Sequence, residues 1–311
     1  MAKHAFTTGR EARLAARDKS FKDQTSGIAP SYLQANLLVL PRRYADDFRL
    51  LCARNPVPCP LVAESAAPGD ATQLKSHLKA PAAKSATNGQ ANGTLHTEDR
   101  PLDVAKDIDL RHDFSRYMVY KDGKLAHEAE DIAAEWSEDH VGFLIGCSFS
   151  FESALAQAGL APRQQAQGRN VPMYRTTIPL CPAGVFVGGT YVVSMRPYRK
   201  ADVEKVRDIT RRFVATHGEP VAWGWDSLEK LGIKDITKPT WGQQSLRLDG
   251  TGAFDQSEED YVPVFWGCGV TPQNAVAMAN LQGTVMAHAP GHMIVLDVQE
   301  YEVFPTAIET A

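Results

Sequence analysis

Two stretches of the chain share one pattern of apolar and polar residues. In the first, an apolar run over residues 141–146 has the length of a buried strand and ends in a glycine. Cys147, Ser148 and Ser150 follow it, and residues 151–158 have the spacing of a helix. Ser150 stands where an N-cap is expected, because its hydroxyl can accept a hydrogen bond from a free helix amide. The pattern predicts a strand, a short polar turn and a helix in succession.

The second stretch follows the same plan. An apolar strand over residues 261–267 again ends in a glycine, and Cys268 follows it. Two residues later, Thr271 as N-cap and Pro272 at the first helical position predict a helix over residues 273–281. The flanking sequences differ, so this is not a sequence repeat. Because free N–H groups and the helix dipole favour negative charge, the pattern is compatible with two helix starts that face one anionic ligand.

The rest of the chain alternates predicted helices and strands. Residues 116–125 have the pattern of a hairpin that turns at an Asp-Gly pair. Helices are predicted at residues 10–19, 41–52, 128–136, 201–217 and 228–236, and extended segments at residues 171–181, 190–197, 220–225, 284–288 and 292–297. This order indicates an α/β fold, with a mixed α+β fold as the alternative. We expect a central mixed sheet flanked by helices and a second, smaller α+β subdomain.

One segment interrupts this pattern. Residues 62–99 are dominated by Ala, Ser, Thr, Gly, Asn and Lys and contain no aromatic residue. Such a segment buries too little apolar surface to offset the entropy cost of ordering it. We therefore predict a disordered low-complexity insertion at residues 62–99. The flanking residues 1–61 and 100–311 are predicted to form one catalytic region of two intertwined subdomains.

The composition of the chain argues against two classes of protein, those that bind nucleic acids and those that span membranes. The chain has 311 residues, of which 43% are apolar and 23% charged, as in water-soluble globular proteins. A net charge of −4 and the lack of a sustained basic run argue against nucleic-acid binding, and no apolar run has the roughly 20 residues that span a membrane. Five cysteines without a CxxC pair indicate a reducing compartment. We expect a cytoplasmic protein, with the mitochondrial matrix as an alternative.

Three polar residues within or after apolar strands are candidates for chemistry. Arg175 and Arg196 lie in such strands, and a buried guanidinium needs an anionic partner. That partner is either a substrate carboxylate or a structural carboxylate of the chain. His288 ends an apolar strand before a Pro-Gly turn, where a side chain can point into a cleft. Its unperturbed pKa of about 6.5 would let it act as acid and base near neutrality, although a histidine there can also be simply hydrogen-bonded.

Several blocks together resemble one family. They cover nearly the whole chain apart from the predicted insertion, and they are residues 26–36, 55–61, 146–152, 171–174, 193–197, 263–273 and 288–291. These blocks are similar to those of a hydro-lyase family that includes D-glutamate cyclase, which converts D-glutamate to 5-oxo-D-proline with loss of water. The resemblance implies a lyase of amino acid metabolism that removes water from a small carboxylic or amino acid. It implies no cofactor and a small-molecule carboxylate as partner, and a homo-oligomer is an open alternative.

The chain departs from the family pattern at three positions. Ala222 stands where the resemblance implies histidine, and Thr240 and Gln243 stand where it implies aspartates. If those groups bind substrate or move protons, this chain has a changed substrate or a reduced activity. Two alternatives to a D-glutamate cyclase-like hydro-lyase therefore stay open. One is a non-catalytic carboxylate-binding protein on the same fold, and the other is a metal-dependent hydratase or dehydratase.

The predicted site combines both cysteine turns with residues of the matching blocks. Cys147 is expected to donate a hydrogen bond or to be a thiolate of lowered pKa at the helix start. The predicted catalytic residues are His288, Cys147 and Cys268, and the predicted substrate-binding residues are Ser148, Ser150, Glu152, Tyr174, Arg175, Arg196, Thr271 and Gln273. No metal is expected. The metal-dependent alternative would draw its ligands from Cys147, Cys181, Cys268 and His288, a set that suits zinc.

Overall fold

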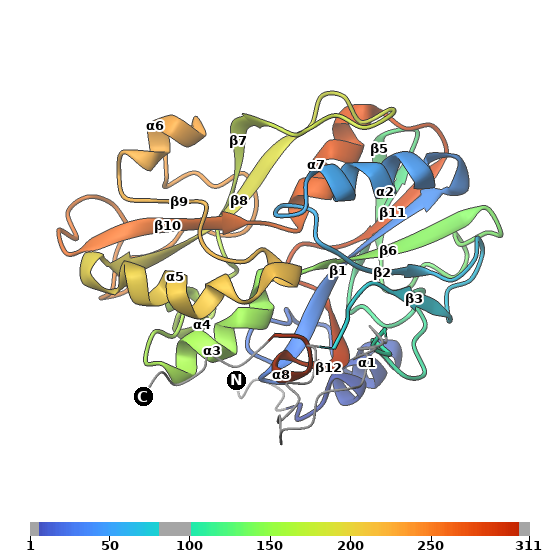
Figure 1. The fold of residues 1–311 in the computed structure, drawn as a ribbon, viewed down its shortest axis with the longest axis horizontal. Coiled ribbons are helices and arrows are strands. Elements are labelled where there is room, and N and C mark those ends of the chain that lie inside the picture. Colours follow the sequence, from blue (N-terminus) through green and yellow to red (C-terminus); the bar gives the residue numbers. More distant parts are fainter. Residues whose placement is uncertain (1–5, 81–100, 305–311) are drawn as a thin grey trace, which may run out of the picture.

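Two antiparallel sheets form the frame of the protein. The computed structural model describes residues 6–80 and 101–304. Within them, the larger sheet has the strand order β3-β2-β6-β1-β11-β4-β5, with β12 also paired to β1, and the smaller sheet has the order β7-β8-β10-β9. In Figure 1 the larger sheet occupies the right-hand part of the molecule and the smaller sheet the left-hand part. The strand pairs are antiparallel, so the observed fold is of the mixed α+β kind.

The central strand of the larger sheet changes its partner halfway along its length. On one edge, β1 (Tyr32–Pro41) pairs with β6 (His140–Gly146) from residue 35 to residue 41. On the other edge, its second half pairs with β11 (Thr284–His288) and its first half with β12 (Ile294–Gln299). The sheet is completed by β2 (Leu61–Ser65), β3 (Leu74–Ser76), β4 (Tyr117–Lys121) and β5 (Lys124–Ala129). The change of partner leaves an interruption beside the middle of β1.

Apolar side chains on both faces of β1 enter separate cores. Leu38 and Leu40 belong to a cluster with residues of α2 (Ala45–Arg54) and α7 (Val270–Ala279). Leu37 and Val39 belong to a second cluster, with residues of α3 (Glu152–Gln157) and α5 (Val203–Arg211). Successive strand residues point to opposite faces, so a continuous apolar run is what a strand covered on both sides requires. Helix α1 (Gly9–Arg17) packs against β12.

The smaller sheet is built from the middle of the chain. Its strands are β7 (Met173–Pro179), β8 (Thr190–Arg199), β9 (Ala222–Trp223) and β10 (Tyr261–Gly267). The chain then returns through α7 to β11 and β12 of the larger sheet. The remaining short helices are η1 (Arg42–Tyr44), η2 (Ser148–Phe151), α4 (Arg163–Ala166), η3 (Lys200–Asp202), η4 (Val214–Thr216), α6 (Ser227–Leu231) and α8 (Glu300–Val303). The combination of helices and strands confirms the predicted fold class.

Two predicted segments differ from the structure. Residues 128–136 do not form a helix, because β5 continues to Ala129 as the partner of β4 and turns follow it. Residues 62–80, predicted to be disordered, contain β2 and β3, and β2 pairs with β6. Pairing with the sheet buries Val62 and Ala63, and this outweighs the polar composition of the segment. The rest of that predicted insertion, at residues 81–100, lies outside the described residues. The division into two intertwined subdomains stays a prediction.

The described residues contain no helix with the length and apolar character needed to cross a membrane.

Candidate functional site

The two cysteine turns meet at one narrow cavity between the sheets. Cys147 follows β6 of the larger sheet and Cys268 follows β10 of the smaller sheet, and these strands lie on opposite sides of the molecule in Figure 1. The cavity has a volume of about 20 Å³, which is room for about one water molecule. Its lining is formed by Asn36, Cys147, Ser148, Phe149, Asn170, Val171, Met173, Cys268, Gly269, Val270, His288, Gly291 and Met293.

The first turn is held by its hydroxyl residue. The last pair of β1 and β6 joins Ala35 to Gly146. The next residue of β1 is Gln34, and its backbone N–H donates to Ser150 Oγ at 2.9 Å. The Ser150 hydroxyl in turn donates to the Gln34 backbone carbonyl at 3.4 Å. The Gln34 carbonyl also accepts the N–H of Cys147 at 3.0 Å. Ser150 therefore continues the edge of the sheet past the end of β6.

The second turn has the same construction in the other sheet. The last pair of β8 and β10 joins Val193 to Gly267. The next residue of β8 is Val192, and its backbone N–H donates to Thr271 Oγ1 at 3.0 Å. The Thr271 hydroxyl in turn donates to the Val192 backbone carbonyl at 3.1 Å. Thr271 thus occupies the same position relative to its sheet as Ser150 does in the first turn. The two turns are structurally equivalent although their flanking sequences differ.

The predicted roles of Ser150 and Thr271 as N-caps are therefore wrong. Helix η2 begins at Ser148 with Cys147 as its N-cap, and the Cys147 sulfur accepts the Phe149 N–H at 3.5 Å. Helix α7 begins at Val270, and its N-cap Gly269 has no side chain to offer. Both hydroxyls are bound to a neighbouring strand, so neither is free for a helix amide or a ligand.

Asn36 joins the two turns, although the sequence analysis did not select it. Its Nδ2 donates to the carbonyls of Ile145 at 3.1 Å and Gly146 at 3.2 Å. On the other side it lies against the second turn, where a Cβ on Gly269 would be only 1.9 Å from Asn36 Nδ2. Only glycine allows this close approach. The signal was present in the sequence, because a buried amide inside an apolar strand needs hydrogen-bond partners.

His288 occupies the interruption beside β1. Its ring is fully buried, and the N–H of Leu37 donates to Nδ1 at 3.1 Å. Gln273 Nε2 also lies 3.0 Å from Nδ1, whereas the single competing acceptor, the Leu37 carbonyl, is 3.2 Å away. Two N–H donors at Nδ1 assign it the lone pair, so the neutral ring carries its hydrogen on Nε2. Nε2 has no hydrogen-bond partner among the described residues, and His288 lines the cavity.

Burial determines the charge of the candidate catalytic groups. It lowers the pKa of His288 to about 4, so this imidazole is neutral near pH 7 and the expected ordinary value is wrong. Burial also raises the pKa of Cys268 to about 11 and raises that of Cys147 well above its ordinary value. Both sulfurs are thus thiols near pH 7, which contradicts the lowered pKa expected for a Cys147 thiolate. His288 and the two thiols are available as hydrogen-bond donors.

Asn170 supplies an unpartnered acceptor to the same cavity. Its Oδ1 is buried and has no hydrogen-bond partner within residues 6–80 and 101–304, while its Nδ2 donates to the Pro290 carbonyl at 3.4 Å. Its backbone N–H donates to Gln243 Oε1 at 2.9 Å. Buried polar groups without partners are rare and need an explanation, which a bound ligand supplies. Nothing in the local sequence around Asn170 distinguished it from an ordinary loop asparagine.

Glu152 and Arg196 form a buried ion pair behind the first turn. Arg196 Nη2 lies 2.6 Å from Glu152 Oε1, and both side chains are almost completely buried. Glu152 also accepts from Ser26, Gln164 and Gln165. The same Nη2 of Arg196 donates to Ser148 Oγ at 3.1 Å. The anionic partner of Arg196 is therefore a carboxylate of the chain, and the pair positions the first turn.

Of the predicted substrate-binding residues, only Ser148 lines the cavity, and Tyr174 and Arg175 belong to strand β7 instead. Arg175 is exposed and stacks on the Trp241 ring at 5.4 Å, so the expectation of a buried guanidinium is wrong. It alternates along β7 with Tyr174, which is buried on the other face and donates its hydroxyl to the Ile236 carbonyl. Strand alternation sends Arg175 to solvent and Tyr174 into the core of the smaller sheet.

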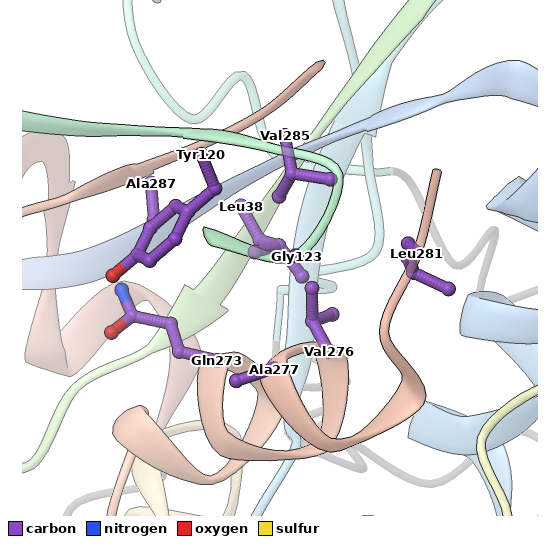
Figure 2. A pocket seen from close by; sticks show the side chains of 9 residues that line it. All are labelled: Leu38, Tyr120, Gly123, Gln273, Val276, Ala277, Leu281, Val285 and Ala287. Atoms are coloured by element: carbon purple, nitrogen blue, oxygen red, sulfur yellow. The ribbon is translucent and has the colours of Figure 1, made fainter. Parts of the chain in front are cut away.

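Gln273 joins the cavity to an apolar groove behind it. Its Nε2 donates to the His288 carbonyl at 3.2 Å in addition to the contact with Nδ1. Figure 2 shows its side chain leaving α7 and pointing toward Tyr120 at one end of the groove. The groove is lined by Leu38, Tyr120, Gly123, Gln273, Val276, Ala277, Leu281, Val285 and Ala287. Gln273 therefore fixes the orientation of the His288 ring from behind.

A larger polar cleft adjoins the cavity. It has a volume of about 470 Å³ and is lined by Phe21, Lys22, Asp23, Gln24, Ser26, Ile28, Arg116, Gly168, Arg169, Gln243 and His292. Gly291 separates the two spaces, because a Cβ there would be 2.8 Å from Asn170 and 3.1 Å from Gln24. Arg116 pairs with Glu128, whereas Arg169 has no ion-pair partner among the described residues and donates only to the Gln244 carbonyl. The cleft thus holds one guanidinium that is free to bind an anion.

The three departures from the family pattern lie apart from the cavity lining. Ala222 packs in the core of the smaller sheet, and Thr240 Oγ1 accepts the backbone N–H of Arg175. Gln243 lines the cleft and holds the backbone of Asn170. Of the three, only Gln243 touches the candidate site, and its amide oxygen offers the acceptor that a carboxylate would have offered.

The predicted zinc ligands do not gather at one point. Cys181 is exposed, while Cys147, Cys268 and His288 line the cavity. Throughout residues 6–80 and 101–304, no group of three or more His, Cys, Asp or Glu side chains is arranged to hold a metal ion.

Comparison with known proteins gives consistent matches. The family model described as D-glutamate cyclase matches residues 141–297, which include both turns and His288. The chain is 44% identical over 294 residues to a Schizosaccharomyces pombe protein, covering 94% of this chain and 85% of that protein. It is 43% identical over 291 residues to a Bordetella petrii protein, covering 94% of each. It is 40% identical to an Azorhizobium caulinodans protein, covering 95% of this chain and 93% of that one. All three are named "Putative hydro-lyase".

Proposed function

This chain belongs to the D-glutamate cyclase family, a family of hydro-lyases, and we propose that it removes water from a small amino acid with two carboxyl groups. The proposed reaction takes place at the cavity between the two cysteine turns, with part of the substrate in the adjoining polar cleft. D-Glutamate, which would give 5-oxo-D-proline, is the proposed substrate. One observation carries this assignment. His288 Nε2 and Asn170 Oδ1 belong to residues that line the cavity, and both atoms are buried without a hydrogen-bond partner among the described residues.

These two atoms complement the two ends of an amino acid. His288 Nε2–H is a donor that suits a carboxylate oxygen, and Asn170 Oδ1 is an acceptor that suits an ammonium group. Each costs about 1–3 kcal/mol while it is buried without a partner, so a ligand that pairs both recovers that free energy. A carboxylic acid without the amine would satisfy only one of them. This favours an amino acid over a simple carboxylate.

The adjoining cleft supports a second carboxylate. Arg169 lies in it next to Asn170 in the chain, and its guanidinium has two ends free for a carboxylate, which it binds with a matching planar fork. A diacid whose amino group reaches Asn170 can place one carboxylate in this cleft. The cleft, with a volume of about 470 Å³, has room for a carboxylate group, whereas the cavity, at about 20 Å³, has room for about one water molecule.

In the proposed reaction, every atom of the amino diacid ends either in the cyclic product or in the water that is released. The amine nitrogen attacks the distal carboxyl carbon, a C–N bond forms, and one C–O bond breaks. The departing oxygen leaves as water with two protons that come from the ammonium group. His288 Nε2–H stabilises the negative charge that develops on oxygen in the tetrahedral intermediate, as a neutral donor. The Cys268 thiol, with a pKa of about 11, can pass a proton to the departing oxygen and recover one from the ammonium.

The direct test is turnover of a defined panel. The purified protein is incubated with D-glutamate, L-glutamate, D-aspartate and 2-hydroxyglutarate, and mass spectrometry follows the loss of one water. We expect product from an amino diacid and none from the hydroxy diacid. Stabilisation of the protein by these acids in thermal unfolding, without any product, would favour the non-catalytic binding protein instead.

A further inference from the structure

The cavity presents two thiols from equivalent positions. Cys147 and Cys268 each follow the glycine that ends a strand, and each precedes a hydroxyl residue bound to the neighbouring strand. Both are free, both are buried, and both line the cavity. The proposed dehydration needs one acid–base group, and one cysteine can supply it. The dehydration gives no reason for a second thiol at the equivalent position of the other sheet.

The surroundings of the two sulfurs share two features. The N–H of the residue two positions later, Phe149 or Val270, lies against each sulfur and lowers the pKa of that cysteine. The buried charge of Arg196 acts on both in the same direction. Burial outweighs these effects and raises the pKa of both cysteines. The N–H donor at each sulfur is nevertheless a feature that favours a thiolate, whereas the Arg196 charge is paired with Glu152, which raises the pKa of Cys147.

Two thiols on opposite sides of one carbon perform a recognised kind of proton transfer. One sulfur, as a thiolate, removes the hydrogen from the carbon next to a carboxylate. The other, as a thiol, delivers a hydrogen to the opposite face of that carbon. One C–H bond breaks and one forms, the thiolate becomes a thiol and the thiol becomes a thiolate, and no oxidant or cofactor is consumed. The carbanion between the two steps spreads its charge onto the carboxylate, where His288 Nε2–H can stabilise it.

We propose that Cys147 and Cys268 form an acid–base pair that exchanges and inverts the α-hydrogen of the amino acid bound in the cavity. This inference rests on the proposed function only for the class of ligand, an α-amino acid. It adds a second activity, racemisation, in which the enantiomer supplied is converted to its mirror image. The two sulfurs serve opposite faces, so each cysteine removes the α-hydrogen of one enantiomer and, in the reverse direction, delivers the hydrogen that forms that same enantiomer.

The test follows the α-hydrogen itself. The full-length protein is incubated with D-glutamate and, separately, with L-glutamate in heavy water, and proton NMR follows loss of the α-hydrogen signal. Chiral chromatography of the same samples detects the opposite enantiomer. We expect exchange with the wild-type protein. Cys147→Ser and Cys268→Ser should each slow exchange by about 100-fold or more, one mainly for the D and the other mainly for the L enantiomer.

Matched controls separate this inference from the dehydration. Cys181→Ser changes an exposed cysteine outside the cavity and should exchange at the wild-type rate. Circular dichroism establishes that each variant is folded. Loss of water from a glutamate by wild-type protein without α-hydrogen exchange overturns the racemisation and leaves the proposed function standing. Exchange without loss of water supports the thiol pair and overturns the proposed dehydration. If wild-type protein shows neither with either enantiomer, both are overturned.

Discussion

His288 and Asn170 are two single residues whose unused atoms define the site. The backbone of Leu37 fixes one nitrogen of His288 and leaves the other to the cavity, and the Pro290 carbonyl does the same for the amide of Asn170. The free atoms are one donor and one acceptor, both buried without partners in the part of the chain that the structure describes. A zwitterionic amino acid offers the matching acceptor and donor. The chemistry of the site therefore depends on neutral groups held in fixed orientations.

Asn170 can be tested with a pair of substitutions. Asn170→Leu removes the acceptor and leaves the substrate ammonium unpaired in the cavity. At about 1–3 kcal/mol for an unpaired polar group, KM for the amino diacid should rise roughly 5- to 150-fold. Asn170→Asp keeps an acceptor oxygen and should restore most of the affinity. Steady-state kinetics at pH 7.5 measure both, and an equal KM for Asn170→Leu and wild type would contradict the assignment.

Arg169 tests recognition of the second carboxylate. Arg169→Ala removes the unpaired guanidinium of the cleft, and calorimetric binding of glutarate or D-glutamate should weaken about 10- to 100-fold, by analogy with other hydrogen bonds to charged groups. Arg42→Ala removes an equal charge from an exposed position outside the cleft and serves as the control. Equal affinities for the two variants would mean that the cleft does not bind the carboxylate.

Sequence could identify some of these residues and not others. His288, Cys147 and Cys268 stand out because each is a reactive side chain at the end of an apolar strand. Arg175 and Arg196 look alike in sequence, yet one is exposed and the other is buried against Glu152. The difference depends on which face of its strand each one occupies. Asn170 carries no local signal, because its role comes from a neighbouring loop that approaches it at Gly291.

The two cysteine turns are one structural element used twice. Each consists of a strand that ends in glycine, a cysteine at the cavity, and a hydroxyl that bonds to the adjacent strand. The cavity also has a methionine from the strand beyond each turn, Met173 from β7 and Met293 next to β12. The main differences between the two halves of the cavity are polar, namely Asn36, Asn170 and His288. We infer that the shared element shapes the cavity and that the unmatched polar residues make its two ends chemically different.

Removal of either hydroxyl should destabilise the protein to a similar extent. Ser150→Ala leaves the N–H of Gln34 without its partner, and Thr271→Val does the same to Val192. Each buried N–H that loses its partner costs about 1–3 kcal/mol, which should appear as a lower free energy of unfolding in urea. Ser257→Ala, an exposed serine at a loop, provides the control. A large loss for one turn and none for the other would contradict their equivalence.

Local pattern predicted most elements and failed where distant pairing decides. The strand–turn–helix order of both turns was readable from residues 141–158 and 261–281 alone. The hydroxyls were misassigned as helix caps, because the strand that binds each of them lies more than 70 residues away in sequence. Residues 62–65 look polar and flexible but pair with β6. Only the assembled sheet provides that partner.

At the scale of the whole molecule, the cavity lies where two sheets and one interrupted strand meet. Strand β1 changes its partner from β11 to β12, and His288 fills the interruption with its side chain. The first turn comes from the larger sheet and the second from the smaller sheet. The site therefore depends on the long return of the chain through α7 into β11. A local reading of the sequence could suggest that the turns converge but could not provide this path.

Buried histidines should make the stability of the whole protein depend on pH. Burial lowers the pKa of His217, His288 and His292 to about 4, while an unfolded histidine titrates near 6.5. Between pH 4 and 6.5 the unfolded chain therefore binds more protons, so the free energy of unfolding falls as the pH is lowered through this window. Each ring contributes about 3 kcal/mol at the low end.

Urea unfolding at several pH values between 4 and 8 measures this dependence. We expect a plateau above about pH 7 and a steep decline below about pH 6. His217→Gln removes one of the three rings without touching the cavity lining and should reduce the decline by about one third. A stability that is constant from pH 8 to pH 4.5 would contradict the buried, neutral state of these histidines.

Turnover of wild-type protein and a His288→Phe variant tests most directly whether the cavity is the active site. Phenylalanine keeps the ring volume and removes the Nε2–H donor, and His127→Phe makes the same change at an exposed histidine as a control. Mass spectrometry follows loss of water from D-glutamate or the best amino diacid of the panel. We predict that kcat falls by about 100-fold or more for His288→Phe and is unchanged for His127→Phe. A folded His288→Phe variant that turns over at the wild-type rate would contradict the assignment of the reaction to this cavity.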